Sequence, residues 1–182
     1  MHTLLAPITL SVSAAGLLLS ILLLVKPGRM RRALTDFPRH ANAGRLLSAI
    51  GFLWSGWLLY HMPMGMLDVY KPVLLIATPV VIGLTWIYLD ELLASRALGG
   101  LFLLVPAPWL AAARLHPSPW RVVASCCAYA MVAKGLLLLL APYQFRWGVR
   151  RFLKTDLQSR LWGAAGVFMY GLLVLLAVIV YG

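Results

Sequence analysis

The segment from Gly135 to Gly171, GLLLLLAPYQFRWGVRRFLKTDLQSRLWGAAGVFMYG, contains the pattern that decides the fold. An apolar run ends at Pro142, a basic linker follows, and a second apolar run begins near Arg160. The same pattern occurs 115 positions earlier, because Pro27 matches Pro142 and Arg45 matches Arg160 without a gap. The sequence therefore predicts a parallel repeat of one hairpin, made of a helix, an interfacial helix and a second helix.

The composition is that of a membrane protein. Of 182 residues, 62% are hydrophobic and only 12% are charged, and the mean hydropathy is +0.88. Soluble domains carry about 25% charged residues. Here apolar runs of about 20 residues recur, which is the length that crosses a hydrocarbon core of about 30 Å. We therefore expect an all-α integral membrane protein that forms a single transmembrane domain over residues 1–182.

Six membrane spans are expected, arranged as three hairpins. The first repeat hairpin covers 4–61, a central hairpin covers 73–113, and the second repeat hairpin covers 119–181. Pro106 and Pro108 are expected to break the fourth span and leave it either kinked or partly re-entrant, because proline removes a helical hydrogen bond. The spans are 4–25, 43–61, 73–89, 97–113, 119–141 and 157–181.

The net charge of +11 is distributed unevenly along the chain. Twelve Lys and Arg residues fall in the three hairpin loops, against three on the opposite side. Cytoplasmic loops carry an excess of positive charge. We therefore expect the hairpin loops in the cytoplasm and both termini outside the inner (cytoplasmic) membrane. This distribution explains the charge without a nucleic-acid partner, and none is expected.

The two basic linkers predict amphipathic helices on the membrane surface. After Pro27 and again after Pro142, apolar residues recur at the i, i+3, i+4, i+7 spacing of one helix face. Asn42 and Asp156 are expected to cap the spans that follow. The opposite, basic face suits anionic lipid headgroups, or alternatively a protein partner. Its residues are Arg29, Arg31, Arg32, Arg146, Arg150 and Arg151.

Small residues in the apolar runs predict close helix contacts, since small side chains let helices approach in lipid. We expect these contacts within the subunit or between copies in a homo-oligomer, or with other membrane subunits. The residues are Gly51, Gly56, Gly163, Gly166 and Gly171.

Lys134 is the one Lys or Arg residue that lies well inside an expected span, away from its ends. An ionised lysine within the bilayer costs roughly 2.5–3.5 kcal/mol on insertion scales. Two interpretations stay open. The ammonium group extends to the nearer interface, or it pairs inside the bundle with Asp90 or Glu91 at the end of the third span.

The hairpin pattern resembles that of the YjeT-like proteins, which are small two-span bacterial inner-membrane proteins. Gly135 precedes Pro142 by seven residues, and Arg160-Leu161-Trp162-Gly163 opens the next span, as in that family. Where the family has Glu, this chain has Lys134 and, in the first hairpin, Leu19. The resemblance covers some 45 residues and their repeat, and it implies an architecture without an activity.

No motif in the sequence predicts catalysis, a metal site or a cofactor. Cys126 and Cys127 are adjacent, and the four histidines share no helical spacing typical of metal ligands. An enzyme is therefore not expected. Two functional classes remain. One is a structural or accessory subunit of a membrane complex. The other is a small homo-oligomeric transporter or channel for a proton, ion or small anion, using Lys134 with Asp90 or Glu91.

Overall fold

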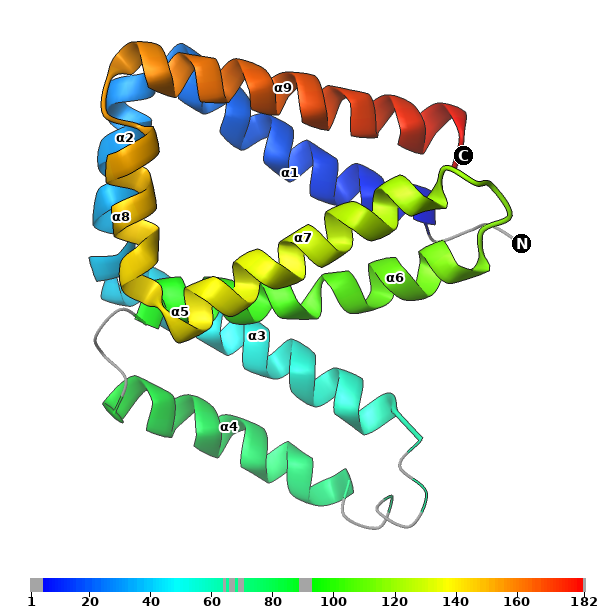
Figure 1. Ribbon diagram of the computed structural model, residues 1–182. Helices are drawn as coiled ribbons and strands as arrows, with labels where there is room; N and C mark the ends of the chain where they lie inside the picture. Colours follow the sequence, from blue (N-terminus) through cyan, green and yellow to red (C-terminus); the bar gives the residue numbers. More distant parts are fainter. Residues whose placement is uncertain (1–4, 64, 66–67, 69–70, 89–92, 182) are drawn as a thin grey trace.

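The computed structural model describes residues 5–63, 65, 68, 71–88 and 93–181, without the side chains of Arg39, Phe145 and Arg146. Every element in these ranges is a helix (Figure 1). The elements are α1 (Leu5–Val25), α2 (Pro27–Asp36), the 3-10 turn η1 (Phe37–Arg39), α3 (Ala41–His61), α4 (Lys71–Tyr88), α5 (Leu93–Leu104), α6 (Pro106–Leu115), α7 (Arg121–Leu140), α8 (Pro142–Phe152) and α9 (Asp156–Ile179).

Five helical segments in the described ranges are long and apolar enough to cross a membrane. They are α1, α4, the α5–α6 segment, α7 and α9. The remaining expected span, 43–61, forms α3, which is not among the five although it has 21 residues. Polar residues near its ends, including Asn42, Arg45 and His61, lower its hydropathy.

The long helices run between two ends of the molecule. At one end α2 and α8 lie side by side, and both chain termini lie at the other end (Figure 1). Proline occupies the start of both short helices, where its missing N–H leaves no hydrogen bond unmade. Separate helices therefore follow Pro27 and Pro142, as expected from the sequence.

The helix boundaries of the first and last thirds of the chain agree after a shift of 115 residues. α2 begins at Pro27 and α8 at Pro142, and α3 begins at Ala41 and α9 at Asp156. The packing does not follow the same symmetry. α1 packs along α9, whereas α5 lies between α3 and α7 and contacts both. The repeat relates α1 to α7 and α3 to α9, so a strict two-fold arrangement would pack α7 along α3 as α1 packs along α9. Instead, α5 separates α3 from α7.

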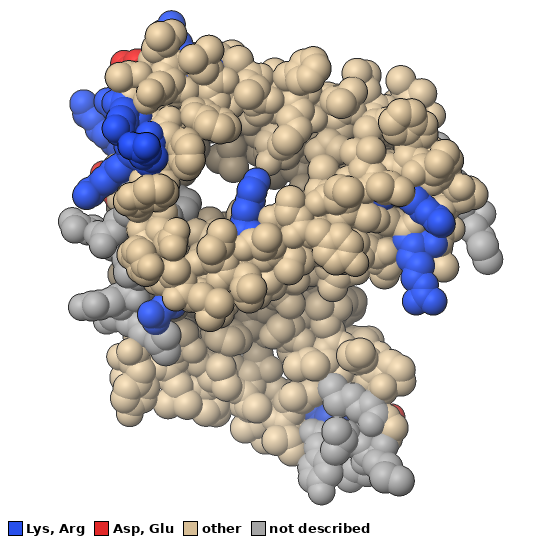
Figure 2. Space-filling model, in the orientation of Figure 1, with Lys and Arg blue, Asp and Glu red and all other residues tan. Residues whose placement is uncertain are grey.

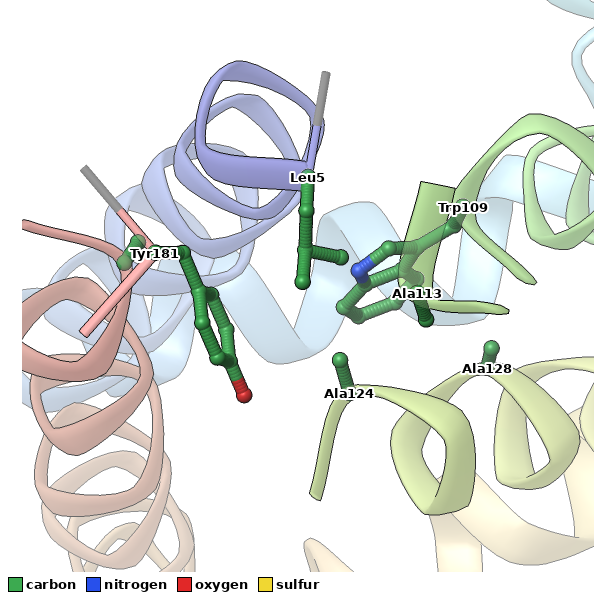
Figure 3. Close-up of a cluster of buried hydrophobic side chains, with 7 residues drawn as sticks. Leu5, Trp109, Ala113, Ala124, Ala128 and Tyr181 are labelled. Atoms are coloured by element: carbon green, nitrogen blue, oxygen red, sulfur yellow. The ribbon is translucent and has the colours of Figure 1, made fainter. Parts of the chain in front are cut away.

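A buried cluster joins α1, α6, α7 and α9 near the chain termini. Leu5, Trp109 and Tyr181 are its large members, and small alanines of α7 let Trp109 approach (Figure 3). The Trp109 indole N–H donates to Thr9 Oγ1 at 2.9 Å. The Tyr181 hydroxyl donates to the Trp120 carbonyl at 2.7 Å. The polar groups of this cluster are paired, as an apolar surrounding requires.

Small residues bring several helix pairs close together. A Cβ added at Gly163 would lie 2.9 Å from the backbone nitrogen of Leu24. At Gly166 it would meet Ser20, and at Gly56 it would meet Thr78 Oγ1 at 2.6 Å. The expected packing residues therefore differ in their surroundings. A Cβ at Gly51 would make an ordinary contact with Leu101, and at Gly171 it would meet nothing within 4 Å.

Two local expectations need correction or refinement. The N-cap of α3 is His40, two residues before Asn42, and the N-cap of α9 is Thr155, one residue before Asp156. Asn42 and Asp156 therefore lie inside their helices. Thr155 Oγ1 accepts a hydrogen bond from the Gln158 N–H, so the hydroxyl acts as the cap. The fourth expected span is interrupted at Val105, and α6 starts at Pro106. This interruption was predicted from the prolines. α6 continues to the opposite end, so the segment does not turn back (Figure 1).

Candidate functional site

A pocket of about 330 Å³ lies between α2 and α8. Four cationic side chains from the two repeats line it together with one hydroxyl and two apolar residues. The cationic residues are Arg31, Arg32, Arg150 and Lys154, and the others are Thr35, Val149 and Leu153. Helices that are 115 residues apart in sequence thus build one basic site.

The amphipathic pattern of the linkers explains this geometry. Val149 and Leu153 are one turn apart on the chain and both are buried, with exposed fractions of 8%. They hold α8 against its surroundings, while Arg150 on the neighbouring face stays exposed. On α2 the adjacent Arg31 and Arg32 reach the same space. The pocket therefore has an apolar floor and cationic walls.

One of the four cations is partly neutralised within the protein. Arg31 Nη1 donates to the Lys154 carbonyl at 2.8 Å and lies 3.5 Å from Asp156 Oδ1. This arginine links α2 to the start of α9. The Thr35 hydroxyl donates to the carbonyls of Arg31 and Arg32, so its proton is used within α2. Arg31 and Thr35 thus line the pocket, but their hydrogen bonds are made within the protein.

The remaining three cations have no acceptor among the residues that the structure describes. The side chains of Arg32, Arg150 and Lys154 form no hydrogen bond or ion pair there, and their like charges repel one another. Figure 2 shows basic side chains gathered over the end where α2 and α8 lie. An anion placed between them would relieve this repulsion, and guanidinium groups bind phosphate or carboxylate oxygens in pairs. The site therefore has the chemistry of an anion receptor.

Three of the six predicted headgroup contacts line this pocket, namely Arg31, Arg32 and Arg150. Arg29 and Arg151 are exposed outside the lining, and the side chain of Arg146 lies outside the described part of the chain. Lys154 was not singled out from the sequence. Arg39 occupies the equivalent position of the first repeat, 115 residues earlier. A basic residue at both positions is the sequence feature that could have identified Lys154.

Lys134 lies on α7 and is exposed. Its two expected acidic partners, Asp90 and Glu91, lie outside the described residues. Within the described ranges no acidic side chain pairs with Lys134. The neighbouring Gly135 is buried against Gly99 of α5, so Lys134 extends from a different side of α7. Figure 2 shows an opening through the molecule between the α1–α9 pair and α7.

The described ranges contain no group of three or more His, Cys, Asp or Glu side chains that could hold a metal ion. Cys126 and Cys127 are both free thiols.

No protein-family model, curated protein or solved structure matches this chain.

Proposed function

We propose that this chain is a multi-pass structural or accessory protein of the inner membrane, and that its basic pocket binds the phosphate of an anionic phospholipid. The single observation that carries the proposal is the convergence of Arg32, Arg150 and Lys154 on one small space between two interfacial helices. Basic pockets at the cytoplasmic ends of transmembrane helices are typical receptors for anionic lipid headgroups.

The position of the pocket supports this ligand over a soluble anion. α2 and α8 each follow a helix that is apolar enough to cross a membrane, so the pocket would lie at headgroup depth. The charge distribution along the chain would direct this end to the cytoplasm and both termini outside. The cytoplasmic leaflet is rich in anionic lipid, which supplies phosphate continuously at the mouth of the pocket.

The test is native mass spectrometry after gentle extraction with membrane lipids retained. We expect a phospholipid mass on the wild-type chain that is lost in the triple variant Arg32→Gln, Arg150→Gln, Lys154→Gln. A matched control neutralises the same number of exposed charges outside the pocket, at Lys26, Arg114 and Arg160. Equal lipid loss in both variants would reduce the site to general surface charge and contradict the proposal.

The same spectra test the accessory role. A second polypeptide in fixed ratio with this chain is the expected result. A homo-oligomer that lacks any other subunit would contradict the accessory role and favour a transporter.

A transporter is the second candidate, because exposed Lys134 lies on α7 and α7 borders the opening in Figure 2. The path for a proton or small anion would then run beside this lysine. Lys134→Met tests it in liposomes. Lost flux with an intact oligomer supports transport, and unchanged flux, or none in the wild type, contradicts it.

A further inference from the structure

A second, larger cavity of about 640 Å³ lies among α3, α4, α5 and α7, apart from the basic pocket. Most of its lining is apolar, with Leu47, Phe52, Leu103 and Leu139 contributing long side chains. Its volume falls within the range of about 300–1,000 Å³ typical of small-molecule sites. Few polar side chains lie on its wall.

The hydroxyl groups of the cavity have already used their protons. Ser48 Oγ donates to the Arg45 carbonyl at 3.0 Å and accepts from the Trp86 indole at 3.1 Å. Ser55 Oγ donates to the Phe52 carbonyl at 3.2 Å. Thr85 Oγ1 likewise donates within its own helix, at 2.7 Å. These side chains therefore offer a ligand no donor.

Arg96 is the one charged residue on the cavity wall, and it is half-buried on α5. Among the described residues, none accepts a hydrogen bond from its guanidinium or pairs with it. Its guanidinium group carries five N–H donors, on a wall that is otherwise mostly apolar. A ligand that satisfies both features carries an anionic oxygen head on a long apolar body.

One wall residue of this cavity, Thr85, belongs to α4, which is a lightly held helix. α4 has no buried residue and packs against α3 alone to any notable extent. Its outward side chains, such as Ile76 and Ile87, are more than two-thirds exposed. An apolar molecule dissolved in the bilayer would reach the cavity past this helix without crossing water.

We propose that this cavity binds one long-chain fatty acid, with its carboxylate on Arg96 and its chain along the apolar walls. A single acyl chain suits a cavity of this size better than a two-chain phospholipid. The guanidinium can bind both carboxylate oxygens at once, a geometry that gives strength and orientation. The proposal is independent of the basic pocket, since the two sites share no residue.

The test measures equilibrium binding of radiolabelled palmitic acid to the full chain in nanodiscs of neutral phosphatidylcholine. Saturable binding is expected, and Arg96→Gln should weaken it about tenfold or more, the effect of losing a charged hydrogen bond. Arg160→Gln removes an exposed charge outside the cavity and should leave the affinity unchanged. Unlabelled palmitic acid should displace the probe, whereas 1-hexadecanol, which lacks the charge, should not.

A second pair of variants tests the apolar part of the site without touching charge. A Cβ added at Gly100 on the cavity wall, or at Gly171 on α9, meets nothing within 4 Å. Gly100→Leu would therefore fill the cavity and abolish binding, while Gly171→Leu would be tolerated. This pair decides the question even if Arg96→Gln fails to insert.

Three results would overturn the proposal. They are binding that does not saturate, equal affinity of Arg96→Gln and Arg160→Gln, and displacement by 1-hexadecanol as effective as by palmitic acid. The triple variant at Arg32, Arg150 and Lys154 should bind palmitic acid normally. Failure of either site can thus be told apart from failure of the other.

Discussion

At Gly163, α9 crosses α1 with backbone against backbone. A Cβ there would lie 2.9 Å from the Leu24 nitrogen and 3.0 Å from the Ser20 carbonyl oxygen. Backbone atoms of a packed helix cannot move aside as a flexible side chain can. Contacts of this kind hold helices together in lipid, where burial of apolar surface gives little net gain.

Gly163→Ala should therefore lower the free energy of unfolding by about 1–3 kcal/mol, the usual cost of overpacking. Gly171→Ala is the control, because a Cβ there meets nothing within 4 Å. It should leave stability unchanged or raise it by up to about 1 kcal/mol through helix propensity. Unfolding titrations in mixed detergent and denaturant measure both. Similar effects of the two substitutions would contradict the packing assigned to Gly163.

Local sequence signals explain where most helices begin and end. Pro27 and Pro142 start their helices because proline fits the first turn, and Pro106 breaks the fourth span for the complementary reason. The pairing of elements was not predictable in the same way. Nothing local indicates that α5 separates α3 from α7, since that choice depends on packing between distant segments.

The residues of the two pockets show the same difference between local signals and distant contacts. Arg31, Arg32 and Arg150 were recognisable from the helical spacing of the linkers, but their meeting in one pocket was not. Arg96 is one of the twelve basic residues counted in the expected hairpin loops, because sequence alone could not reveal that α5 begins at Leu93 and carries it onto a cavity wall. Contacts between segments that are distant in sequence determine both the basic pocket and the position of Arg96.

The start of α9 gives a prediction at the level of the element. Thr155 Oγ1 accepts from the Gln158 N–H at 3.2 Å and satisfies one of the free donors of the first turn. Thr155→Ala should destabilise the protein by about 1 kcal/mol, whereas Thr155→Ser, which keeps the hydroxyl, should cost only a few tenths of that. Thermal unfolding in detergent compares them. An alanine variant as stable as the serine variant would show that the cap contributes nothing.

At the scale of the whole molecule, the two ends differ in charge. The end with α2 and α8 carries the basic pocket, and both chain termini lie at the other end (Figure 1). If the positive end faces the cytoplasm, its side chains are shielded from reagents added outside intact cells.

Single cysteines in a background lacking Cys126 and Cys127 test this orientation. Ser118, between α6 and α7, is at the end with the termini, and Lys154 is at the pocket end. A membrane-impermeant maleimide added to intact cells should label Ser118→Cys at once and Lys154→Cys only after permeabilisation. The reverse pattern would place the basic pocket outside.

The headgroup site is best tested by titrating the purified chain with defined lipids and following binding by native mass spectrometry. We expect phosphatidylglycerol to bind in preference to phosphatidylcholine, and the Arg32, Arg150 and Lys154 triple variant to lose this preference by about tenfold or more. The control variant at Lys26, Arg114 and Arg160 should retain it. Equal binding of the two lipids by the wild-type chain, or equal loss in both variants, would contradict a headgroup site between α2 and α8.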